Sequence, residues 1–75
     1  MATSLNNHLG DRIREARRSA GFRNIEQLAV RMDIGQRTLQ RWETGESEPT
    51  VSRLREIAAL TDRPLSFFLS GEVAA

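Results

Sequence analysis

An all-α fold of five short helices is the architecture that the sequence predicts. Apolar residues recur at helical spacing through residues 9–69, which places them on one face of each helix. Glycine, asparagine and proline separate the periodic segments, as expected where helices begin and end. The chain has 75 residues, enough for one small domain around a single core. We expect a bundle over residues 9–69, a flexible N-terminus at 1–8 and a tail at 70–75.

The first helix is expected over residues 9–22. Its apolar residues lie at i, i+4, i+7 and i+11, the spacing of one helix face. The members of this face are Leu9, Ile13, Ala16 and Ala20. Gly21 is the expected C-cap, because glycine adopts the left-handed conformation without a steric cost. Asn6 or Asn7 is the candidate N-cap.

Two short helices are expected next, over residues 24–32 and 36–44. Asn24 with Gln27 three residues later is a capping-box signature, so the earlier helix should begin there. Gly35 permits a tight turn between the two helices. The inward-facing residues of this pair are expected to be Leu28, Ala29, Met32, Leu39 and Trp42.

A polar stripe runs along the helix expected over residues 36–44, which ends at Gly45. Its residues lie at i, i+1, i+4, i+5 and i+8, which is one helix face. They are Gln36, Arg37, Gln40, Arg41 and Thr44. A solvated helix face is one interpretation of this stripe, and a surface that reads a ligand is the other.

Two further helices are expected over residues 50–61 and 64–69. Thr50 follows Pro49 and is the candidate N-cap. The residues of the earlier helix that should face the core are Val51, Leu54, Ile57, Ala58 and Leu60. Those of the later helix are Leu65, Phe68 and Leu69, which leaves Phe67 to point outward.

Charge is unevenly distributed, although the formal net charge is only +1. Residues 1–44 hold eight arginines against five acidic residues, a balance of +3. Residues 45–75 hold three against five, a balance of −2. All 11 basic residues are arginine, whose planar guanidinium matches phosphate groups and guanine edges. A bias toward GC-rich codons explains the absence of lysine equally well.

Several classes of function are disfavoured by what the chain lacks. It has no cysteine, so we expect neither disulfides nor a cysteine-based metal site. One histidine, His8, and no tyrosine leave no constellation for acid–base catalysis, so we expect no enzyme, cofactor or small-molecule ligand. No apolar run reaches the ~18 residues of a membrane span, and the N-terminus lacks the pattern of a secretory signal. A cytoplasmic location is expected.

Four segments of the chain resemble the phage-repressor and Cro-type helix-turn-helix family, also called the xenobiotic-response-element family. They are LGDRIREARRSAG, EQLAVRMDI, TLQRWETGESEP and VSRLREIAALTDRPLSFFL, which cover roughly residues 9–69. The most specific part is RWETG with its following proline and the segment LREIAAL. The resemblance implies a compact, lambda-repressor-like bundle of five helices, whose third helix enters the major groove of double-stranded DNA.

By this resemblance, the polar stripe over residues 36–44 reads bases. Gln36 would bond N6 and N7 of adenine, and Arg37 or Arg41 would bond O6 and N7 of guanine. Gln40 and Thr44 lie further along the stripe, and a contact with phosphate alone is the alternative for Thr44. The DNA phosphate contacts that the resemblance implies are Arg23, Asn24, Thr38 and Arg53.

A structural ion pair between Arg17 and Glu43 is also implied, because these positions pair in the family. A bidentate pair there would fix the angle of the recognition helix. For Asn24, a cap without any DNA contact is the alternative.

Two features depart from the family pattern. Glu46 and Glu48 follow the helix over residues 36–44, where many relatives place basic or neutral polar residues beside phosphate. These carboxylates would either point away from DNA or weaken its binding. The first seven residues contain no basic side chain, so an arm in the minor groove is not expected.

One short helix reads too few base pairs to find a site in a genome, and family members commonly bind as dimers on two half-sites. An outward Phe67 would form a small two-fold contact, giving a homodimer that is weak without DNA. Packing of Phe67 against the tail of its own chain is the alternative.

The function expected is that of a transcription regulator, a repressor at a palindromic operator. The alternative is a protein-binding module, such as the antitoxin of a toxin–antitoxin pair.

Overall fold

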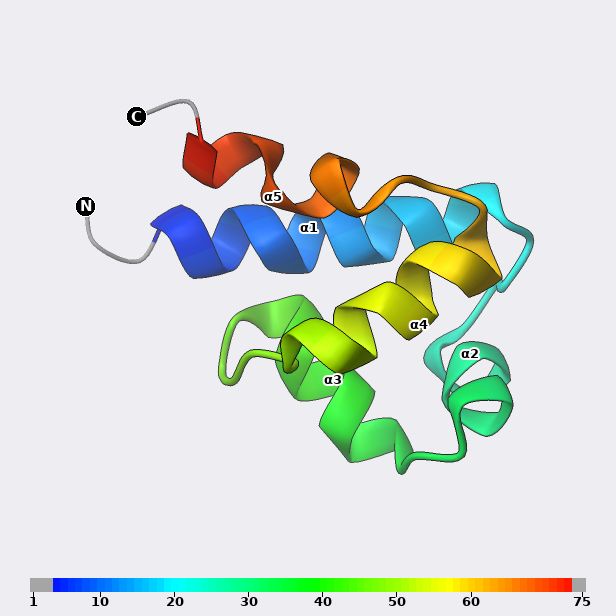
Figure 1. Ribbon diagram of the computed structural model, residues 1–75. Coiled ribbons are helices and arrows are strands. Elements are labelled where there is room, and N and C mark those ends of the chain that lie inside the picture. Colours follow the sequence, from blue (N-terminus) through cyan, green and yellow to red (C-terminus); the bar gives the residue numbers. More distant parts are fainter. Residues whose placement is uncertain (1–3, 74–75) are drawn as a thin grey trace.

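Five helices and no strand make up the described part of the chain, residues 4–73 of a computed structural model (Figure 1). Side chains are described for residues 9–69, so His8 and the tail residues 74–75 lie outside the described side chains. The helices are α1 (Ser4–Ser19), α2 (Ile25–Met32), α3 (Gln36–Thr44), α4 (Val51–Thr61) and α5 (Leu65–Val73). The all-α prediction is confirmed. Within the described range, no helix has the length and apolar character needed to cross a membrane.

The longest helix, α1, lies at the centre of the bundle. It packs against α3 and α5 and also contacts α4, while α2 packs against α3. In Figure 1, α5 runs above α1, and the other three helices lie below it. Burial of apolar side chains from all five helices stabilises this arrangement. The buried residues are Leu9, Ile13, Ala16, Leu28, Ala29, Met32, Leu39, Trp42, Leu54, Ile57, Ala58 and Phe68.

Local sequence signals account for the helix ends. After α1, Gly21 has a φ of 94°, and the N–H of Phe22 donates to the carbonyl of Arg17 at 3.0 Å. A hydrogen bond between residues five positions apart at the end of a helix is typical of a Schellman motif, so the expected glycine cap is present. At the start of α4, the side chain of Thr50 accepts a hydrogen bond from the N–H of Arg53 at 3.1 Å, as an N-cap does.

The close crossing of α1 over α3 depends on Gly10. This residue is buried, and a Cβ added to it would overlap the carbonyl group of Glu43, near the end of α3. The sequence does not predict this role of Gly10, because an isolated glycine inside a helix indicates only a lower helix propensity at that position.

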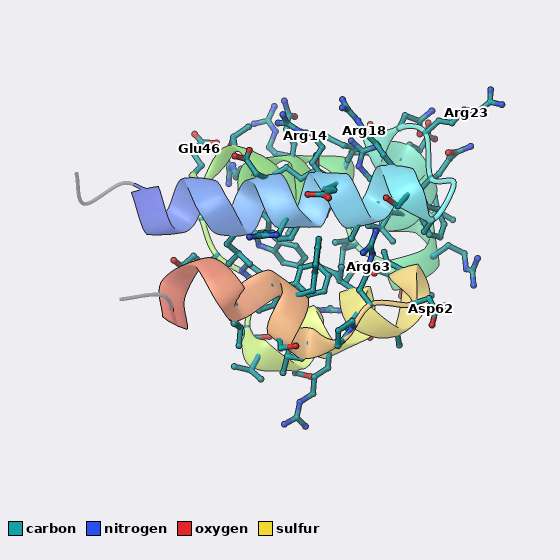
Figure 2. All side chains as sticks on the ribbon, turned by 90° about the horizontal axis from the view of Figure 1, so that it is seen from above. Arg14, Arg18, Arg23, Glu46, Asp62 and Arg63 are labelled. Atoms are coloured by element: carbon teal, nitrogen blue, oxygen red, sulfur yellow. The ribbon has the colours of Figure 1, made fainter. Side chains whose placement is uncertain are left out.

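The two terminal helices are longer than the sequence predicted. α1 begins at Ser4, so Asn6 and Asn7 lie inside the helix and neither caps it. α5 continues to Val73, beyond the expected end at residue 69. In Figures 1 and 2 the last turns of α5 lie beside the first turns of α1. Each extension therefore has a neighbouring helix, which the pattern of one segment alone does not reveal.

Two apolar residues expected in the core are exposed instead. Ala20 lies after the last residue of α1, where the chain already turns away. Val51 is the first residue of α4 and is 60% exposed. At the other end of α4, Thr61 is buried, and its hydroxyl donates to the carbonyl of Ile57 at 2.7 Å. The buried face of α4 is thus shifted toward its C-terminus, where Thr61 completes it.

Candidate nucleic-acid interface

The polar side chains of α3 form an exposed face that continues into the α3–α4 loop. All five members of the expected stripe are exposed: Gln36, Arg37, Gln40, Arg41 and Thr44. Four of them, together with Glu46, line a shallow hollow of about 220 Å³. On the opposite face, Leu39 and Trp42 are buried in the core. Packing of this face against the core therefore fixes the position of α3, and the buried Trp42 is not available for stacking with a nucleic-acid base.

A buried ion pair joins α1 to the end of α3. Arg17 Nε donates to Glu43 Oε2 at 2.7 Å, and Arg17 Nη2 donates to Glu43 Oε1 at 3.2 Å. Arg17 Nη1 donates to the carbonyl of Phe22 at 2.9 Å. The two side chains are only 5% and 2% exposed. The expected pair is therefore formed, and all three guanidinium nitrogens of Arg17 have an acceptor, which a buried charge requires.

Arg14 is a second partner of Glu43 that the sequence reasoning missed. Its Nε lies 3.5 Å from Glu43 Oε1, and its side chain is 41% exposed. The available signal was its position three residues before Arg17, since residues at this spacing are neighbours on a helix surface. One carboxylate thus serves two arginines of α1, of which Arg14 is the one that reaches solvent.

The start of the α3–α4 loop turns Glu46 back toward the hollow. Gly45 ends α3 with a φ of 87°. The N–H groups of Glu46 and Ser47 then donate to the carbonyl of Arg41, at 2.9 and 3.3 Å. Glu46 Oε1 lies 3.9 Å from Arg41 Nε, with both side chains more than half exposed. The Glu46 side chain therefore lies on the same side as the polar stripe.

The N-terminus of α2 is held by reciprocal hydrogen bonds. Asn24 Oδ1 accepts from the N–H of Gln27 at 3.0 Å, and Gln27 Oε1 accepts from the N–H of Arg23 at 2.6 Å. The motif differs from a standard capping box, in which the second bond returns to the capping residue itself. Arg23 and Asn24 are both exposed, at the end of the helix where the dipole and free N–H groups favour anions.

Arg53 and Thr38 differ in how free they are to meet a phosphate. Arg53 Nη1 donates to Glu56 Oε1 at 2.7 Å and lies 3.5 Å from the carbonyl of Met32. A phosphate would therefore have to compete with Glu56 for this guanidinium. Thr38 is exposed in the first turn of α3.

Three arginines gather along one edge of the molecule. In Figure 2, Arg14, Arg18 and Arg23 project from this edge, with Glu46 near one end, whereas Arg63 lies on the side of α4 and α5. Because Glu46 also lines the hollow of α3, the edge adjoins the polar stripe. No group of three or more metal-binding side chains was found in the part of the chain that the structure describes. The three arginines supply this edge with guanidinium groups, which bind anions.

Phe67 is half-buried and does not point freely outward. Its ring meets that of Phe68 edge-on, with centroids 5.2 Å apart, and packs against the core. The guanidinium carbons of Arg12 and Arg63 lie 5.2 and 4.7 Å from its centroid, within the range of cation–π contacts. Its own chain thus covers part of the ring and places two positive charges beside it.

Comparisons with known proteins give a family match and a curated relative. The model of a family described as "Helix-turn-helix" matches residues 13–68. The "Uncharacterized transcriptional regulator in ATPase CF(0) region" of Rhodospirillum rubrum is 35% identical over 63 residues. This alignment covers 84% of the chain and 57% of the relative, so the chain spans little more than half of that protein's length. No solved structure gave a significant match.

Proposed function

The chain belongs to the helix-turn-helix family of phage-repressor and Cro-type DNA-binding proteins, and from this premise we propose that it is a sequence-specific transcription regulator. Helix α3 would enter the major groove of double-stranded DNA and present its polar stripe to base edges. The observation that carries the proposal is this stripe, which is exposed on a helix whose other face is fixed in the core. The relative from Rhodospirillum rubrum is named a transcriptional regulator, which supports the same function.

Base reading is assigned to the first two turns of α3, because the N-terminal part of a recognition helix approaches the bases. Gln36 matches the N6 and N7 groups of adenine, and Arg37 and Arg41 match O6 and N7 of guanine. Each bidentate pair discriminates by about 1–3 kcal/mol. Gln40 would extend the contact. Thr44 donates its hydroxyl to the Arg41 carbonyl at 3.2 Å, so toward DNA it would act as an acceptor or touch only the backbone.

Phosphate contacts would fix the register of α3 in the groove without reading sequence. Asn24 uses its Oδ1 for the helix cap, which leaves its amide NH2 group to donate to a phosphate oxygen. Arg23 lies beside it, and Thr38 lies at the start of α3. Arg53 would contribute by exchanging Glu56 for phosphate.

A homodimer on a palindromic operator would double the number of base pairs read. Phe67 is the proposed contact residue, since it is only partly buried and lies beside Arg12 and Arg63. A small contact of this kind would be weak in free protein and tighter on DNA, where both half-sites hold the subunits together. Occupation of the operator would then exclude polymerase, which is the action of a repressor.

Selection from a pool of random duplex DNA tests the proposed function. We expect a palindromic motif with half-sites about one helical turn apart, and a protein that sediments as a monomer alone and as a dimer on this DNA. Recovery of no motif, with all sequences bound alike, would contradict sequence-specific regulation. Copurification of a small protein partner together with that result would favour the toxin-binding alternative.

A further inference from the structure

Arg14 and Arg18 have no part in the proposed base reading, yet they lie on the same edge as Glu46 (Figure 2), which lines the hollow of the polar stripe. They are four residues apart on α1, a rise of about 6 Å, so they stand one above the other on one helix face. Arg23 continues the edge toward the N-terminus of α2. We name Arg14, Arg18 and Arg23 the arginine row.

The charges of the arginine row are largely uncompensated by the side chains of residues 9–69, the range in which side chains are described. Arg14 contacts Glu43 only through Nε, at 3.5 Å, so its two Nη groups remain available. Arg18 is exposed and takes part in none of the ion pairs formed by the described residues. Asp11 and Glu15 lie three residues earlier on α1, but within that same part of the chain neither pairs with these arginines.

The position of Arg14 is set by the buried ion pair. Glu43 is held by two hydrogen bonds from Arg17, and its Oε1 also accepts a hydrogen bond of 3.5 Å from Arg14 Nε. A guanidinium that is already oriented loses less conformational freedom when it binds an anion. This anchoring separates Arg14 from an ordinary solvated arginine.

We propose that the arginine row binds phosphate groups of the DNA backbone and extends the contact of α3 to the flanking base pairs. The inference rests on the proposed function, because it takes the edge beside the polar stripe to be the face that meets DNA. The spacing of Arg14 and Arg18 spans about two phosphates of one strand, which follow each other at about 3.4 Å along the helix axis. These contacts strengthen binding to any sequence and carry no base preference.

A salt titration with a random-sequence duplex of 20 base pairs tests the row. The proteins are the wild type, the double variant Arg14→Gln/Arg18→Gln, the charge-preserving double variant Arg14→Lys/Arg18→Lys, and Arg55→Gln. Arg55 is exposed on α4, two residues after Arg53 and therefore on a different face of that helix. The slope of log K against the logarithm of salt concentration is negative. We expect its magnitude to decrease by about 0.9 for each lost phosphate contact, and therefore by nearly two in the glutamine double variant.

The controls separate the row from bulk charge and from misfolding. We expect wild-type slopes in Arg55→Gln and in the lysine double variant, and thermal unfolding of all variants near that of the wild type. An unchanged slope in the glutamine double variant, or an equal change per charge in Arg55→Gln, would contradict phosphate binding by the arginine row. If the wild type binds no duplex at all, the proposed function fails with it. If binding is strong but selection yields no motif, base reading fails and the row stands.

Discussion

Arg17 of α1 and Glu43 of α3 are joined by two hydrogen bonds of 2.7 and 3.2 Å in the interior of the protein. Glu43 follows directly after the buried Trp42, so the pair fixes the C-terminal half of α3 against α1. The N-terminal half of α3 carries Gln36 and Arg37, which would have to reach base edges. The orientation of the polar stripe therefore depends on a buried contact near the C-terminal end of the same helix.

Replacing Arg17 by methionine should destabilise the protein strongly. The change leaves the Glu43 carboxylate buried with only Arg14 nearby, and breaking a buried pair costs about 3–5 kcal/mol. Urea unfolding measures the loss. Arg18→Met is the matched control, because this neighbouring arginine is exposed, and its effect should stay within about 0.5 kcal/mol. Equal losses in the two variants would show that the pair has no special weight.

Replacing Gly10 by alanine should push α1 away from α3. A Cβ there overlaps the backbone carbonyl of Glu43, which cannot move aside as a flexible side chain can. The expected cost is about 1–3 kcal/mol, as for overpacking of a core, measured by thermal or urea unfolding. Gly35→Ala provides the comparison, since no atom lies within 4 Å of a Cβ at that glycine. A larger loss at Gly35 than at Gly10 would be inconsistent with this account.

Two substitutions of Asn24 distinguish a helix cap from a DNA contact. Asn24→Ala removes the cap and should cost about 1 kcal/mol of stability. Asn24→Asp keeps a capping oxygen but replaces the amide NH2 donor by negative charge, so stability should be retained and DNA binding weakened. Urea unfolding and a DNA titration give the two quantities. Unchanged DNA affinity in Asn24→Asp would mean that this residue is a cap and nothing else.

Neutralising Glu46 should strengthen DNA binding. Its carboxylate lies 3.9 Å from Arg41 and lines the hollow of the polar stripe, where it would repel a DNA phosphate and compete with it for the guanidinium. Because both side chains are largely exposed, their mutual attraction is weak and Glu46→Gln should hardly change stability. We expect affinity to rise severalfold at low salt and less at high salt. Glu48→Gln changes the same charge at a residue that does not line the hollow, and an equal gain there would refute a specific role for Glu46.

The sequence predicted the helices and their inner faces because those depend on local patterns. Asn24 with Gln27, Gly21 and Thr50 each supplied an end signal, and each acts as a cap or terminator in the structure. The ends at Ser4 and Val73 were missed. They depend on the packing of α1 against α5, which joins segments distant in sequence.

The part of the candidate site that lies on one helix face could be predicted from the sequence. The contacts that depend on tertiary structure could not. The polar stripe follows directly from the spacing of residues on α3. Three contacts depend on tertiary structure. Arg14 shares Glu43 with Arg17, and the guanidinium groups of Arg12 and Arg63 lie beside the ring of Phe67, so both contacts join different elements. The approach of Glu46 to Arg41 depends on the path of the turn after α3. No pattern within a single segment contains them.

Binding of Arg37→Ala to single-base variants of the selected operator shows whether α3 reads bases. Arg23→Ala is the control, because a phosphate contact carries no base preference. The account predicts that Arg37→Ala loses discrimination at one position in each half-site, by about 1–3 kcal/mol, and keeps it at the others. It also predicts that Arg23→Ala weakens all sequences alike. A uniform loss of affinity in both variants would contradict base reading by α3 and reduce the stripe to a basic surface.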